Sequence, residues 1–295
     1  MGQLLLAQGL RGDGSYRRDG RCVGYVEASG TALDGGCGCR DMAEGAGIGD
    51  DGMEGRSCLR EGDGSGLDAA GVELRRDGGG LSLVGDGMVL RADFPRLLAR
   101  TVPDRIGHEL LVRAARVRGV ESPVAIDATA GLGEDSFLLA AAGFTVELYE
   151  HDPVVAALLR DGLERAMEDP DTAQIASRMH LHESDSIAAL SAPEHLPDVV
   201  YLDPMFPERR KSSAVKKKSQ LLQRLEGPCT DEDASALVEA AIAARPRKVV
   251  VKRPPKGPYL AGIEPAYSIE GKSVRFDCLL PSSMPAERAG RASSC

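Results

Sequence analysis

Short apolar runs alternate with helical segments from residue 123 of this 295-residue chain onward. Five runs read as strands, at residues 124–127, 145–150, 179–182, 198–203 and 248–252. Helical segments lie between them at residues 135–142, 153–167 and 231–244. Apolar strands that alternate with helices lie parallel in one sheet covered on both faces. Two last runs, near 267–269 and 274–278, follow each other without a helix. The pattern therefore predicts an α/β, doubly wound sheet with an antiparallel edge hairpin.

Before residue 123 the composition and the hydrophobic pattern of the sequence change twice. Residues 1–70 hold 18 of the 35 glycines, with seven basic and twelve acidic residues. Such a segment has few apolar groups to offset its loss of entropy on folding, so we expect a flexible, acidic extension. Residues 71–97 contain short alternating runs broken by glycines, which predicts a small β-rich region of antiparallel strands. Residues 104–119 predict one amphipathic helix that ends at Gly119.

These changes divide the chain into four parts. We expect the extension (1–70), the small β-hairpin region (71–97), the main α/β domain (98–282) and a C-terminal tail (283–295). No run of 18 apolar residues is present, so we expect no membrane span. The opening Met1–Ala7 segment lacks the basic flank and cleavage pattern of a signal peptide, which favours a cytoplasmic protein. The seven cysteines form no Cys-x-x-Cys pair, which argues against a metal site.

A glycine turn follows the first strand of the main domain, directly after Asp127. Gly131 and Gly133 allow backbone to approach a ligand closely. The next position of the dinucleotide pattern is Ser136, and the acids Glu134 and Asp135 at the helix start would repel a pyrophosphate. The same acids would attract the ammonium and sulfonium groups of S-adenosylmethionine. The turn thus favours a methyl donor over NAD, with an NAD-dependent oxidoreductase as the alternative.

Two more polar positions follow strands of the same sheet. Glu150 ends the second strand, 19 residues after Gly131, where an acid accepts hydrogen bonds from both ribose hydroxyls. The alternative for Glu150 is an ordinary solvated glutamate. Asp185 and Ser186 follow the third strand, where they would reach an adenine edge or form a simple polar loop.

The fourth strand ends in Asp203-Pro204-Met205-Phe206. An exocyclic amino nitrogen is a poor nucleophile because its lone pair is delocalised into the ring, so positioning must supply most of the rate. The Asp203 carboxylate and the Pro204 carbonyl could accept its two N–H groups, and Phe206 could stack on the base. The alternative is a strand followed by an ordinary proline turn.

Positive charge is concentrated just after this motif, although the net charge is −9. The segment 206–218 has one acid and six basic residues: Arg209, Arg210, Lys211, Lys216, Lys217 and Lys218. Lys252 and Arg253 at the end of the fifth strand should lie on the same sheet edge. Phosphate contacts from these residues would position an RNA or DNA strand, with the acceptor base unpaired or flipped.

Four separated segments resemble one known family, in the same order. They are Asp127–Asp135, Pro153–Leu163, Val199–Pro207 and Val249–Pro254, within a resemblance over about residues 98–282 to ribosomal RNA small subunit methyltransferase J. The resemblance implies a class I, Rossmann-like S-adenosylmethionine-dependent methyltransferase fold. It also implies methylation of the N2 amino group of one guanine in 16S rRNA of the small ribosomal subunit.

The resemblance also implies a donor site, residue by residue. It carries over to Glu134, Asp135, Glu150, His151, Asp185, Ser186 and Asp203, beside Asp127, Gly131 and Gly133 of the turn. Two alternatives stay open from the sequence: an amino-group methyltransferase on DNA or another RNA, and a nucleic-acid-binding protein that keeps the fold without turnover. The sequence makes no prediction of the oligomeric state.

Overall fold

The structure, a computed structural model, describes residues 71–193, 196–205, 221–222, 225 and 229–283. Several sequence predictions lie outside these residues. They are the extension 1–70 with its four cysteines, Phe206, the six basic residues from Arg209 to Lys218, and all of the tail but Ser283.

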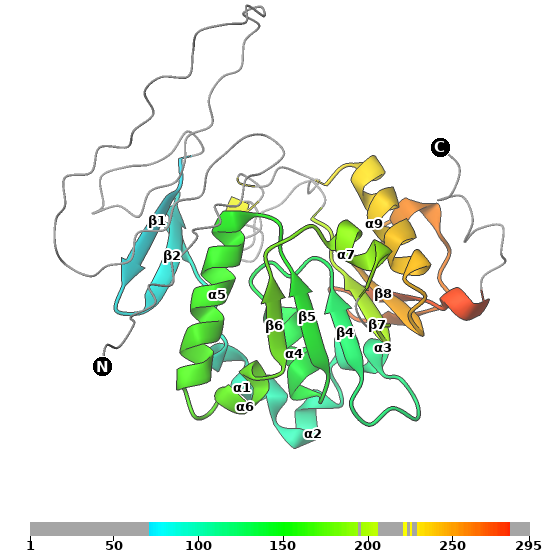
Figure 1. Ribbon diagram of the computed structural model, residues 1–295, viewed down its shortest axis with the longest axis horizontal. Helices are drawn as coiled ribbons and strands as arrows, with labels where there is room; N and C mark the ends of the chain where they lie inside the picture. Colours follow the sequence, from blue (N-terminus) through cyan, green and yellow to red (C-terminus); the bar gives the residue numbers. More distant parts are fainter. Residues whose placement is uncertain (1–70, 194–195, 206–220, 223–224, 226–228, 284–295) are drawn as a thin grey trace, which may run out of the picture. The chain divides into compact units, whose positions relative to one another are not determined.

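The main domain is built on a seven-stranded sheet with the order β6-β5-β4-β7-β8-β10-β9 (Figure 1). Five strands run parallel: β4 (Val124–Asp127), β5 (Thr145–Tyr149), β6 (Met179–His182), β7 (Val199–Leu202) and β8 (Lys248–Arg253). At the far edge, β10 (Arg275–Leu279) is antiparallel to both β8 and β9 (Tyr267–Glu270). The predicted α/β sheet with an antiparallel edge hairpin is confirmed.

Helices cover both faces of this sheet, and the central strands feed an apolar cluster on each side. One cluster joins α3 (Leu110–Ala115), α4 (Glu134–Ala141), α5 (Pro153–Glu168) and α6 (Ala173–Ala176), and the other joins α7 (Ser186–Ser191) and α9 (Asp231–Ala243). In β7, Val199 and Tyr201 belong to the first cluster, whereas Val200 and Leu202 belong to the second. Burial on both faces explains why this strand reads as a continuous apolar run.

A separate three-stranded antiparallel sheet precedes the main domain, as the sequence predicted. It consists of β1 (Glu73–Asp77), β2 (Gly80–Gly85) and β3 (Met88–Leu90). This sheet is fixed to α5 by charged hydrogen bonds. Arg76 donates to Asp161 at 2.7 Å, and Arg165 donates to the Ala92 carbonyl at 2.6 Å.

The prediction of one continuous helix over residues 104–119 is wrong. The chain instead forms α1 (Leu98–Thr101), α2 (Pro103–Ile106) and α3. Glu109 leaves the helical conformation at ψ 129°, and Arg100 holds its carboxylate through two hydrogen bonds of 2.8 and 2.7 Å. α3 ends where Arg116 leaves the helical conformation at ψ 126°, and Lys248 Nζ donates to the carbonyls of Ala114 and Arg116 at 2.7 and 2.8 Å. Tertiary contacts thus override the local pattern.

Among the described segments, none of the helices combines the length and apolar character that a bilayer span requires. The described residues also contain no group of three or more His, Cys, Asp or Glu side chains placed to hold a metal ion.

Candidate active site

The polar residues predicted from the strand ends meet at one edge of the main sheet. Asp127 ends β4, Glu150 follows β5, Asp203 follows β7, and Lys252 is the penultimate residue of β8. All four strands run in the same direction, so their carboxyl ends share this edge (Figure 1). Open α/β sheets bind ligands outside this edge.

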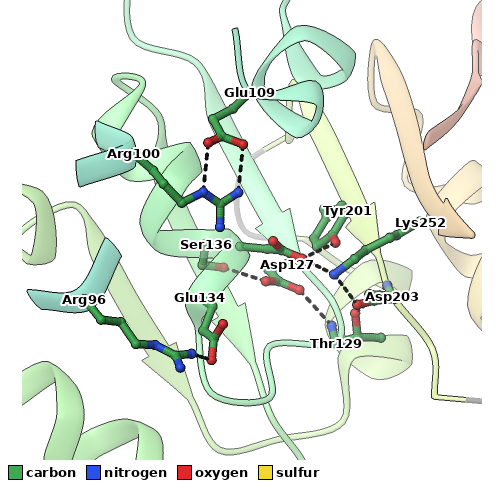
Figure 2. Close-up of polar contacts among 11 residues, drawn as sticks. Arg96, Arg100, Glu109, Asp127, Thr129, Glu134, Ser136, Tyr201, Asp203 and Lys252 are labelled. Carbon is green, nitrogen blue, oxygen red and sulfur yellow. Dashed lines mark hydrogen bonds and ion pairs between the residues drawn. The ribbon is translucent and has the colours of Figure 1, made fainter. Parts of the chain in front are cut away.

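Asp127 shapes the glycine turn from within. Its side chain accepts hydrogen bonds from the Thr129 amide at 3.1 Å and the Ser136 hydroxyl at 2.5 Å (Figure 2). Burial raises the pKa of Asp127 to about 7, although both hydrogen bonds favour the carboxylate. Only 1% of the residue is exposed. These contacts hold the turn, while a contact of Asp127 with the donor remains a prediction.

The two turn glycines both have a left-handed backbone. Gly131 has φ 53° and Gly133 has φ 73°, values that strain residues with a side chain. A Cβ at Gly133 would lie 2.7 Å from Leu159 Cδ1, so a side chain there would have to displace the buried Leu159 side chain. A Cβ at Gly131 would meet nothing nearer than the Thr129 carbonyl at 4.0 Å. Gly131 therefore leaves open space where a ligand can approach the backbone.

Glu150 connects the glycine turn with the start of α5. Its carboxylate accepts from the Gly131 amide at 3.0 Å and from the Asp152 amide at 2.8 Å. Burial raises its pKa to about 7, opposed by these backbone hydrogen bonds. His151 Nδ1 lies 3.6 Å from the same carboxylate, and its own side chain is largely exposed. The structure therefore brings Glu150 to the turn, while its contact with a ribose remains a prediction.

The two acids at the start of α4 point in different directions. Glu134 forms an ion pair with Arg96 (Figure 2). Asp135 Oδ2 instead accepts from the Tyr201 hydroxyl at 2.6 Å and from Lys252 Nζ at 2.7 Å. Burial favours a raised pKa for Asp135, but the Lys252 charge and the two hydrogen bonds outweigh it and lower the pKa. Both acids are already paired with cations, so they attract an ammonium group less than the sequence alone suggested.

Lys252 also joins Asp135 to Asp203. Its Nζ donates to Asp203 Oδ2 at 2.8 Å, while the Asp203 amide donates to the Thr129 hydroxyl at 2.7 Å (Figure 2). Burial alone lowers the pKa of Lys252, but the two carboxylates outweigh it and raise the pKa above its ordinary value. Lys252 is therefore a permanent cation between two carboxylates. Burial also raises the pKa of Asp203, and the charge of Lys252 opposes that rise.

The remaining predicted positions differ in their accessibility. Asp185 is exposed and caps α7, where its side chain accepts from the Ile187 amide at 2.8 Å, and Ser186 beside it is 9% exposed. Pro204 is buried. Arg253 is 6% exposed, and its Nε donates to the Pro258 carbonyl at 3.0 Å. The phosphate contacts expected of Lys252 and Arg253 remain predictions, and their contacts inside the protein favour structural roles.

Comparisons with known proteins identify the family. A family model for SAM-dependent methyltransferases matches residues 88–281. A ribosomal RNA small subunit methyltransferase J from Neisseria meningitidis serogroup B is 45% identical over 204 residues, which cover 68% of this chain and 80% of that protein. The chain belongs to the ribosomal RNA small subunit methyltransferase J family. This assignment agrees with the resemblance seen in the sequence and decides against the oxidoreductase alternative.

Two further relatives support the family assignment. The methyltransferase J of Pseudomonas paraeruginosa is 49% identical over 170 residues, which cover 57% of this chain and 64% of that protein. The crystal structure of a SAM-dependent methyltransferase from Neisseria gonorrhoeae aligns with a TM-score of 0.60 at 36% identity. The alignment covers 76% of this chain and 88% of that chain. The class I methyltransferase fold predicted for the main domain is therefore confirmed.

Sequence reasoning missed two members of this methyltransferase site. Tyr201 lies in the apolar run of β7, and only its need for a buried hydrogen-bond partner hinted at a polar role. Thr129 lies inside the glycine turn and was treated as part of its backbone. Lys252 was selected from the sequence, but as a contact to phosphates and not as the link between Asp135 and Asp203. Since Leu202 pairs with Val251 in register, Asp203 and Lys252 are the next neighbours, and this could have been inferred from the strand ends.

Proposed function

We propose that this protein transfers a methyl group from S-adenosylmethionine to the N2 amino group of a guanine in 16S rRNA, as a cytoplasmic enzyme acting on the small ribosomal subunit. The observation that carries the proposal is the Asp203 carboxylate, bonded to Lys252 at 2.8 Å beside the glycine turn. Membership of a SAM-dependent methyltransferase family supports the donor. The names of the relatives support the rRNA substrate.

The residues around the glycine turn fit the proposed donor. Gly131 leaves room for close approach, and the buried Glu150 beside it can accept hydrogen bonds from ribose hydroxyls. Asp185 and Ser186 lie after β6, where they can reach the adenine edge. When bound, S-adenosylmethionine supplies a methyl group on a positively charged sulfur. The carboxylate of Asp135, whose pKa is lowered by Lys252, and the carboxyl group of Asp203 favour that sulfonium over a pyrophosphate.

The proposed acceptor site is formed by Asp203 and Pro204. Lys252 binds Oδ2 of Asp203, so the other carboxylate oxygen and the Pro204 carbonyl accept the two N–H groups of the amino nitrogen. This pairing fixes the nitrogen in line with the methyl group, which is the main contribution that a protein can make to such a transfer. Phe206 follows in sequence and is proposed to stack on the guanine. The basic run 209–218 is proposed to contact phosphates of the same RNA.

The test is to map the methylated nucleotide. The protein is incubated with labelled donor and undermethylated small subunits, and the product is digested and analysed by mass spectrometry. We expect label on one guanosine at N2. Label on a pyrimidine, or on protein alone, would contradict the proposal, and donor binding without any transfer would favour the non-catalytic alternative. Parallel reactions with DNA and with unrelated RNA test the other amino-group substrates.

A further inference from the structure

The loop of residues 254–259, which we call the post-β8 loop, follows Lys252 and Arg253 directly. Two buried guanidinium groups hold its backbone. Arg253 Nε donates to the Pro258 carbonyl at 3.0 Å. Arg275 donates to the Pro255 carbonyl at 3.0 Å and to the Gly257 carbonyl at 3.1 Å. These hydrogen bonds fix three carbonyls of one short loop, which gives the loop a defined shape before any partner binds.

Arg275 is itself held in place. It forms two hydrogen bonds of 2.8 Å with the Asp277 carboxylate, and it is only 7% exposed. Its guanidinium also lies over the Tyr259 ring, with Cζ 5.2 Å from the ring centroid. Tyr259 nevertheless remains 41% exposed, and Lys256 on the same loop is exposed. The loop therefore presents a supported aromatic ring and a cation to solvent.

The post-β8 loop lies at the edge that carries the proposed acceptor site. Lys252 donates a hydrogen bond to Asp203, and Arg253 interacts electrostatically with both Arg275 and Asp203. Lys272, in the turn between β9 and β10, adds a further exposed cation. Of the acids here, Asp277 is bonded to Arg275, and Glu270 pairs with Arg275 across the β9–β10 register. Lys256 and Lys272 are thus two exposed cations on the side of the sheet where this loop lies.

We propose that the post-β8 loop binds single-stranded RNA next to the target guanine, with one unpaired base stacked on Tyr259 and a phosphate contacted by Lys256. This inference rests on the proposed rRNA substrate. A base that reaches Asp203 must be unpaired, so its neighbours are available for stacking on an aromatic ring. The exposed cations Lys256 and Lys272 favour a phosphate backbone over an acidic or neutral protein surface.

Tyr267 provides a matched control for Tyr259. It is also 41% exposed, and it also has a cation over its ring, because Lys248 Nζ lies 5.6 Å from the centroid. However, Tyr267 lies level with Val250, whereas Glu270 lies level with Arg253 at the end of β8. Tyr267 is three residues from Glu270 along β9, and three residues of strand span about 10 Å. Tyr267 therefore lies about 10 Å from the active edge. A general effect of losing an exposed tyrosine would therefore appear at both positions.

The experiment compares Tyr259→Leu, Tyr259→Phe, Lys256→Gln and Tyr267→Leu with the unchanged protein. RNA affinity is measured by fluorescence anisotropy on naked, undermethylated 16S rRNA over a range of salt, and donor affinity by calorimetry. We expect Tyr259→Leu to weaken RNA binding on the order of 10-fold, since stacking on one aromatic ring contributes that much or more. Tyr259→Phe and Tyr267→Leu should bind normally. Lys256→Gln should reduce the salt slope by about 1. Donor affinity should not change in any variant.

Equal RNA affinity in Tyr259→Leu and the unchanged protein would overturn the inference, as would an equal loss in Tyr267→Leu. A loss of affinity for assembled subunits alone, with naked RNA bound normally, would assign the loop to a ribosomal protein and also overturn it. The proposed function is judged separately, by methyl transfer in the unchanged protein. If that transfer fails, the loop is still tested by the RNA affinities.

Discussion

Lys252 Nζ lies 2.8 Å from Asp203 Oδ2, so the carboxylate at the end of β7 is held by a cation from the neighbouring strand. The same ammonium binds Asp135 at 2.7 Å, and Asp135 in turn accepts a hydrogen bond from Tyr201. The glycine turn and the proposed acceptor site are therefore one connected network. A substitution in the glycine turn should therefore affect the proposed acceptor site, and a substitution in the acceptor site should affect the turn.

Lys252→Met should reduce kcat more than it changes the KM for RNA. Without the ammonium, Asp203 loses the contact that orients it, and misplacement of this kind costs roughly 100-fold in rate. Lys252→Arg should recover part of the loss because it keeps the charge. Steady-state kinetics on undermethylated subunits measure both parameters. A normal kcat in Lys252→Met would remove this residue from the mechanism.

The pH profile of Lys252→Met gives a second readout that a merely structural role would not change. Burial raises the pKa of Asp203, and the Lys252 charge opposes that rise. Removal of Lys252 should therefore raise the pKa of Asp203 further, and the acid side of the kcat profile should move to higher pH. An unshifted profile in an otherwise folded variant would contradict this prediction.

Glu150→Gln should weaken donor binding about 10-fold, because a neutral amide replaces a carboxylate that accepts from two backbone amides and is proposed to accept from the ribose. In the unchanged protein the pKa of Glu150 is raised to about 7, so donor affinity should fall as the pH is lowered through 7. Calorimetry at several pH values measures both effects. Glu147→Gln is the control, since Glu147 lies in β5, just before Glu150, but is bonded to His182 at 2.6 Å. Donor affinity that is independent of pH in the unchanged protein and in Glu147→Gln would argue against ribose binding by Glu150.

Tyr201→Phe should destabilise the fold by about 1–3 kcal/mol, since it removes a buried hydroxyl that donates to a charged carboxylate at 2.6 Å. Denaturant unfolding with an unchanged slope measures this difference. Tyr259→Phe, at an exposed position, should stay within about 0.5 kcal/mol of the unchanged protein. Equal stability of the two variants would mean that the Tyr201–Asp135 bond contributes nothing measurable.

Asp127→Asn should flatten the dependence of stability on pH. Burial raises the pKa of Asp127 to about 7 from its ordinary 3.8. A raised folded-state pKa means that this group stabilises the fold fully below pH 3.8, and that the contribution is lost as the pH rises through 7. Unfolding midpoints measured between pH 4 and pH 8 should therefore fall less in Asp127→Asn than in the unchanged protein. Parallel curves for the two proteins would contradict the prediction.

The sequence predicted those parts of the site in which a residue can be located from the strand that precedes it. The run Val199–Leu202 is buried on both faces, so its composition locates the strand and places Asp203 at the end. Glu150 was found from its spacing after Gly131, and the structure joins the two by a hydrogen bond of 3.0 Å. These features follow from local pattern and from the geometry of a parallel sheet.

Side-chain pairs that are distant in sequence could not be predicted in this way. Lys252 reaches Asp135 across 117 residues, and Lys248 reaches the Ala114 carbonyl of α3 across 134 residues. No periodicity records such contacts, because each partner alone looks like an ordinary charged residue. The short helices before β4 were missed for the same reason.

The most direct test of the central claim removes the proposed acceptor atom itself. Once the methylated guanosine is mapped, an RNA that carries inosine at that position lacks only the N2 amino group. Single-turnover transfer to the guanosine and inosine forms is then compared with the same protein and labelled donor. The account predicts full transfer to guanosine and none to inosine, with similar RNA affinity for both. Transfer to the inosine form would show that Asp203 and Pro204 hold some other atom, and would contradict the account.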